Sequence, residues 1–165
     1  MSADYSEEIG RLNEALAQNP DDAVSYLARA NAYLEQGDFQ QAVDDYTRSI
    51  GAAYKLRGMA FFSAGNFPQA VEDYGKAIEQ NPVDAASYHN RGIAHNAMGN
   101  YQQAIEDYNL SLELNPQDAT AYYNKGVAYK MLGNYQEFIE AFKVSARLGF
   151  EPAQKLLGDM GIPWQ

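Results

Sequence analysis

The chain has no cysteine and few basic residues, and both absences narrow what it does. Without cysteine it has neither a disulfide framework nor thiol chemistry. Its 12 Lys and Arg residues face 22 Asp and Glu residues, which gives a net charge of −10. Binding to nucleic acid or to an anionic membrane needs clustered Lys and Arg. We therefore expect neither as a partner.

Long apolar runs and catalytic motifs are also absent. No stretch is long and apolar enough to span a bilayer, and the start, MSADYSEEIG, is polar and acidic, unlike a signal peptide. A cytoplasmic location is therefore the default expectation. His89 and His95 are the only histidines, and no Ser-His-acid spacing, phosphate loop or zinc pattern accompanies them. We expect no enzyme activity and no cofactor.

The chain does contain a sequence unit that repeats with a period of 34 residues. Residues 85–118 read AASYHNRGIAHNAMGNYQQAIEDYNLSLELNPQD, and residues 51–84 and 119–152 follow the same pattern. A fixed period in this range indicates a stacked helical solenoid, in which each unit packs mainly on its neighbours. We expect one all-α solenoid domain over the whole chain.

Each unit encodes two helices joined by a tight turn. Asp84 precedes the first apolar-periodic run as a helix cap, Gly99 ends that run, and Asn115-Pro116 ends the second. Small residues recur where helices must approach closely: Gly58, Gly92 and Gly126 in the first helix, with Ala42, Ala70 and Ala104 in the second. Large aromatic residues fill the space between the two helices.

The sequence resembles the tetratricopeptide repeat family over nearly its whole length. The family's pattern is met by Tyr88, Gly92, Gly99, Ala104, Tyr108, Ser111 and Pro116, with His95 at a position where the family has an aromatic residue. The resemblance implies a right-handed solenoid of antiparallel helix pairs, whose first helices line a concave groove. It also implies a function in binding a peptide or a segment of another protein.

The repeat pattern divides the chain into a single series of units. We expect a half-repeat helix within residues 5–22 and a capping helix with a tail at residues 153–165. Between them lie four repeats, at residues 23–50, 51–84, 85–118 and 119–152. Terminal units of solenoids are often atypical because one of their faces meets water.

Charged residues also recur in columns. Arg29, Arg57, Arg91 and Lys125 share a column in the first helices, and Asp45, Asp73 and Asp107 share one in the second. We expect an ion pair between the two helices of a unit, which Lys125 lacks because Ala141 stands opposite. The carboxylates recur roughly 10 Å apart, too far for one metal ion to bind them together. We therefore predict no metal site.

The family's geometry gives the candidate binding residues, which lie on the first helices and face the groove. They are Lys55, Met59, Phe62, His89, Asn90, Ile93, Tyr123, Asn124 and Val127. Relatives that clamp the C-terminal carboxylate of chaperone tails need Asn, Lys and Arg where this chain has Met59, Thr120 and Asn124. The mixed, partly apolar surface is better suited to a peptide with apolar anchors.

The repeat is interrupted at Ile50-Gly51, where six residues of the usual linker are missing. Three outcomes are open: a fused helix from about residue 39 to 64, a cramped hairpin at Gly51, or an ordinary linker that is absent from this sequence. Apolar spacing from Phe39 to Ala53 favours the fused helix. Fusion would keep the two halves of the chain apart and expose an apolar face on each. Exchange of segments with a second copy, giving a homodimer, is then an alternative function to peptide binding.

Overall fold

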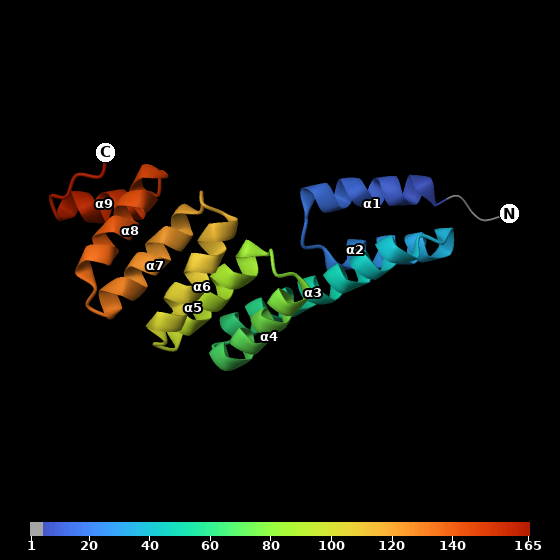
Figure 1. Cartoon of the computed structure of the whole chain (residues 1–165), viewed down its shortest axis with the longest axis horizontal. Coiled ribbons are helices and arrows are strands. Elements are labelled where there is room, and N and C mark those ends of the chain that lie inside the picture. Colours follow the sequence, from blue (N-terminus) through green and yellow to red (C-terminus); the bar gives the residue numbers. More distant parts are fainter. Residues whose placement is uncertain (1–4) are drawn as a thin grey trace.

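The computed structural model describes residues 5–165, and this part of the chain consists of helices, turns and short connections without strands. The helices follow one another in chain order (Figure 1). Their bounds are α1 Ser6–Gln18, α2 Ala23–Gln36, α3 Phe39–Ser63, α4 Phe67–Gln80, α5 Ala85–Ala97, α6 Tyr101–Leu114, α7 Ala119–Met131, α8 Tyr135–Arg147 and α9 Glu151–Asp159. The all-α helical repeat fold is therefore confirmed.

Local sequence signals explain where these helices begin and end. The carboxylates of Asp22, Asp84 and Asp118 accept hydrogen bonds from backbone N–H groups at the starts of α2, α5 and α7. A glycine ends each tight turn between paired helices with a positive φ, for example 79° at Gly99. Only glycine adopts that conformation at little cost.

Antiparallel pairs α5–α6 and α7–α8 pack tightly, and each second helix also packs on the first helix of the next pair. The close approach within a pair depends on glycine. A Cβ built at Gly92 would lie 2.8 Å from Cε1 of Tyr108, and one at Gly126 would lie 2.5 Å from Cδ2 of Phe142. Small residues and large aromatic residues therefore complement each other as the sequence predicts, and buried rings fill the space between helices.

Helix α3 is the one element that departs from the regular pairs. It runs without interruption through Ile50-Gly51, so this chain has the fused helix and not a hairpin at this point. Gly51 is buried there, and a Cβ on it would lie 3.1 Å from Cβ of Gln80. Its lack of a side chain lets the end of α4 approach α3.

The fused helix separates the chain into two stacks (Figure 1). The first half of α3 packs with α2, which also packs on α1, while the second half belongs with α4 and α5. In Figure 1, α1 and α2 lie at one end of α3, and α4 to α9 form the longer stack at the other end. The division into repeats stays a prediction.

At the C-terminus, α9 covers the last helix pair. Ala153 and Leu157 are fully buried against Phe138 and Phe142, and Trp164 packs at the edge of this cluster. None of the described helices is long and apolar enough to cross a membrane.

Candidate functional site

A hollow of about 150 Å³ opens where α3, α4 and α5 meet. Its lining is mostly apolar and comes from all three helices: Met59, Phe62 and Ser63 of α3, Tyr74 of α4, and Asn90 and Ile93 of α5. Small-molecule sites usually enclose about 300–1,000 Å³. The hollow is therefore of a size for one or two side chains of a partner rather than for a whole small molecule.

Packing beneath the hollow fixes its walls. Tyr74 is 2% exposed, and burial raises its pKa to about 12. Gly58 brings α3 against this ring, since a Cβ there would lie 2.8 Å from Cε1 of Tyr74. Phe62 packs on Phe67 with 5.2 Å between the ring centroids. Met59, at the rim, is 47% exposed and can adapt to what binds.

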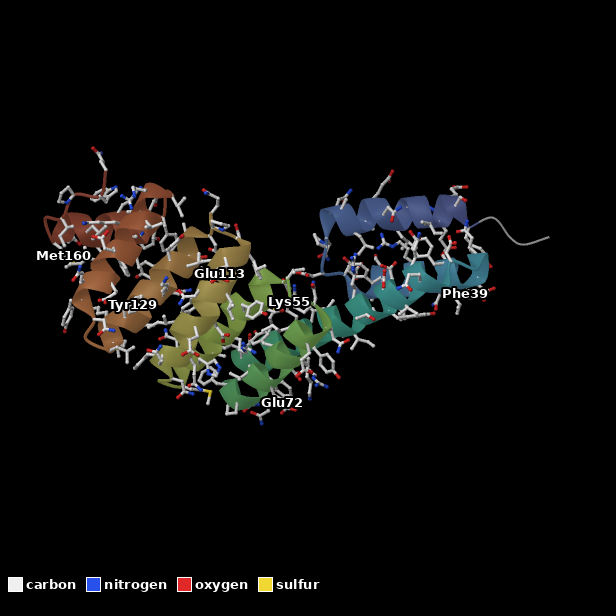
Figure 2. All side chains as sticks on the ribbon, in the orientation of Figure 1. Phe39, Lys55, Glu72, Glu113, Tyr129 and Met160 are labelled. Atoms are coloured by element: carbon white, nitrogen blue, oxygen red, sulfur yellow. The ribbon has the colours of Figure 1, made fainter. Side chains whose placement is uncertain are left out.

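Lys55 lies apart from this hollow, at the point where α3 passes from one stack to the other (Figure 2). Its side chain is 5% exposed, and its ammonium pairs with Asp84 at 3.1 Å and with Asp21. Asp21 comes from the connection between α1 and α2, and Asp84 caps α5. The Lys55 charge is thus matched within the chain, between the N-terminal stack and the C-terminal one.

His89 occupies the same column one repeat later and is held in a similar way. Its Nδ1 lies 2.9 Å from Oδ2 of Asp118, and its Nε2 lies 3.1 Å from Nδ2 of Asn124. If the Asn124 amide donates to Nε2, the proton of a neutral imidazole is on Nδ1 and is donated to Asp118. Hydrogen bonds of Asp118 with Thr120 and Ala121 help to lower the pKa of this carboxyl, against an opposing effect of burial.

Tyr123 and Val127 pack on the C-terminal cluster. The Tyr123 ring lies 4.6 Å from the Phe142 ring and 5.1 Å from that of Phe150, measured between centroids. Val127 is a half-buried neighbour of the same cluster.

The nine candidate residues therefore fall into two groups, and their role in binding stays a prediction. Met59, Phe62, Asn90 and Ile93 line one hollow together, while Lys55, His89, Asn124, Tyr123 and Val127 have partners elsewhere in the chain. Sequence reasoning missed Ser63 and Tyr74 as lining residues. Tyr74 is one of the large aromatic residues of the second helices, and its ring both packs in the buried cluster with Ala70 and Ala94 and lines the hollow.

Ion pairs between paired helices confirm the charged columns. Each of Arg29, Arg57 and Arg91 reaches its aspartate at 2.6 Å, namely Asp45, Asp73 and Asp107. The hydrogen bonds that Arg91 donates to Asp107 raise the pKa of Arg91, although burial opposes the shift. Lys125 has no ion pair among the described residues, and burial lowers its pKa.

Acidic residues are distributed unequally between the two kinds of helix. The second half of α3 with α5 and α7, which the family's geometry would place along the groove, contains no Asp or Glu. The second helices α4, α6 and α8 carry Glu72, Asp73, Glu79, Glu106, Asp107, Glu113, Glu137 and Glu140. The strongly negative net charge is thus carried mainly by other segments, although the carboxylates of Asp84 and Asp118 reach Lys55 and His89 from the helix caps.

Comparison with known proteins agrees with this geometry. The family pattern described as TPR repeat matches residues 58–99 and 94–133, and one described as tetratricopeptide repeat matches residues 12–44. No curated protein sequence matches the chain.

Solved structures share the fold. The crystal structure of MamA has a TM-score of 0.60 at 24% identity, and the match covers 88% of this chain and 89% of that one. The Arabidopsis OM64 TPR domain has a TM-score of 0.61 at 27% identity, covering 65% and 93%. The second TPR domain of human RPAP3, solved in complex with an HSP70 peptide, has a TM-score of 0.65 at 24% identity, covering 71% and 99%. The repeat pattern, the helix pairs and these matches together show that the chain belongs to the tetratricopeptide repeat family.

Proposed function

We propose that this protein is a non-catalytic interaction scaffold that holds a peptide or a segment of a partner protein in its concave groove. The hollow between α3, α4 and α5 carries the proposal, because it is open, mostly apolar and bounded by Met59 and Ile93. An apolar side chain of the partner would fill it, and the Asn90 amide at its edge can bond to the partner's backbone.

The chemistry of the groove favours an apolar anchor over a carboxylate clamp. The RPAP3 domain was solved with a peptide ending in EEVD. In this chain Lys55, the lysine nearest to such a clamp by sequence, is already neutralised by Asp21 and Asp84. Binding an acidic tail would require one of these ion pairs to break.

A library of displayed random peptides, selected on the protein, tests the proposal. We expect the selected peptides to share an aliphatic or aromatic residue. Met59→Glu and Ile93→Glu should each weaken their binding by more than about 2 kcal/mol, roughly 30-fold, as loss of a central contact does. The matched control is Leu110→Glu, which changes an exposed leucine on α6. Equal affinities for all three variants, with their helix content intact, would move the site away from the hollow.

A second candidate function is self-association, and the continuity of α3 favours it. Because α3 does not turn at Gly51, the N-terminal stack cannot fold back on the C-terminal stack of the same chain. A second copy could cover both by exchange of segments, which is a low-cost route to a dimer when a hinge is too short. Light scattering should give twice the chain mass of 18.3 kDa.

The control for self-association restores the missing linker. Inserting Glu-Gln-Asn-Pro-Val-Asp, the sequence of residues 79–84, between Ile50 and Gly51 should allow a hairpin and yield a monomer. A native chain that stays monomeric at high concentration would exclude the exchanged dimer and leave the groove proposal untouched.

A further inference from the structure

Small residues recur at one position of the first helices, and their exposure shows which surface of α3 is not packed against another helix. Ala94 of α5 and Ala128 of α7 are fully buried, because the preceding second helix packs on each of them. Ala32 of α2, next to α1, is also buried. Ala60 holds the same position in α3 and is exposed. A second column repeats the pattern, with Ser87 and Ala121 fully buried and Ala53 exposed.

The complementary surface is exposed on the first half of the same helix. Ile105 of α6 is 3% exposed in a cluster with Ala128, whereas Val43, at the matching place in α3, is 58% exposed. Leu112 of α6 is 7% exposed, and the matching Ile50 is 48% exposed. Val43 thus holds the place of the side chain that packs against the buried alanine at α6 and α7.

We propose that α3 pairs with α3 of a second copy, so that Val43 of one chain packs against Ala60 of the other and the reverse. This inference rests on the proposed self-association and specifies its surface and alignment. The occupant is a second copy because the surface missing from Ala53 and Ala60 is one that this chain itself carries on Val43 and Ile50. The side chains match those that pack together at α6 and α7.

A two-fold symmetric dimer would bury both exposed surfaces of α3 at once. Val43 and Ala60 lie on one helix, on either side of Ile50-Gly51. Two such helices in antiparallel orientation place each surface against its complement, and the contact closes on itself without leaving a free surface to polymerise.

The exchange would also extend the groove. Helices α3 and α5 lie in contact along the groove, as do α5 and α7. The partner's α2 would take the corresponding place beside the second half of α3. Leu34 and Leu56, both exposed in the single chain, would then face a shared surface next to Met59. The groove of each long stack would be completed by the other chain.

Cysteine pairs test this arrangement directly, because the native chain has no cysteine. Val43→Cys and Ala60→Cys are combined in one chain, which is purified, oxidised and analysed by non-reducing electrophoresis. Within one straight helix the two sites are separated by 17 residues, about 25 Å, whereas a disulfide needs Cα atoms about 4.4–6.8 Å apart. A disulfide within the chain is therefore excluded unless α3 bends. The matched control, Ile105→Cys with Ala128→Cys, should form a disulfide within one chain.

We expect the Val43→Cys, Ala60→Cys chain to become a covalent dimer, and each single-cysteine variant to remain uncrosslinked. A disulfide within one chain would show that α3 folds into a hairpin and would overturn the proposal. Failure to form any disulfide, while the control pair forms, would overturn the alignment of the two helices. Light scattering of the same sample would then show whether self-association by another surface still stands.

Discussion

The close packing of Gly92 against Tyr108 predicts a measurable penalty for a single methyl group. In Gly92→Ala the new Cβ would lie 2.8 Å from Cε1 and 3.0 Å from Cδ1 of a ring that is fully buried. Overpacking of this kind costs about 1–3 kcal/mol. Alanine favours a helix over glycine by about 1 kcal/mol, so the net loss in unfolding free energy should be about 0–2 kcal/mol.

Gly75 provides the matched control, since it also lies inside a helix but has room around it. The nearest atom to a Cβ there is Nη1 of Arg91, at 3.9 Å. Gly75→Ala should therefore gain the helix preference, about 1 kcal/mol, without a steric cost. The difference between the two variants isolates the steric contribution, at about 1–3 kcal/mol.

Urea unfolding followed by circular dichroism measures this difference, provided that the slopes of the transitions agree among the variants. We expect a lower midpoint for Gly92→Ala and a higher one for Gly75→Ala than for the native chain. Equal stabilisation of both variants would refute the claim that glycine is required there for the approach of α5 to Tyr108.

Two further predictions concern charge. Burial lowers the pKa of His95 below 6.5, so the unfolded chain binds more protons, and stability should fall as the pH drops below about 6.5. The variant His95→Tyr introduces the residue that the next repeat has at this position, Tyr129. It should make the urea midpoint depend less on pH between pH 8 and 5. An unchanged pH dependence would contradict the role of His95. Arg91→Leu should destabilise by about 3–5 kcal/mol because it leaves the buried Asp107 carboxylate unpaired, whereas adding Asp107→Leu should recover much of the loss. A double variant as unstable as Arg91→Leu would argue against that reason.

The sequence alone predicts most of the fold because each repeat carries its own signals. Asp84 and Gly99 mark helix ends, and Gly92 marks the close approach to Tyr108. These signals are local or recur at a fixed period, so they need no three-dimensional information. The path of the chain at Gly51 stays open in the sequence, because a fused helix and a hairpin were both compatible with its residues.

The site was predicted less completely, for a physical reason. Lys55 is sequestered by Asp21, which comes from the connection between α1 and α2, 34 residues earlier. Tyr123 packs on Phe150, which immediately precedes α9 and stands where the two preceding repeats have Pro116 and Pro82. The position of a residue in the repeat predicts that it faces the groove. Whether its side chain is free to bind depends on contacts with the ends of the chain and with irregular connections, which the repeat pattern does not show.

Methyl NMR spectroscopy tests the central claim most directly, namely that the hollow between α3, α4 and α5 receives the partner. The protein is labelled at Met, Ile and Leu methyl groups and titrated with a peptide selected on the native chain. We expect the methyl signals of Met59 and Ile93 to shift with the peptide and those of Leu110 to stay in place. Shifts that leave Met59 and Ile93 unchanged while the peptide binds would contradict the account.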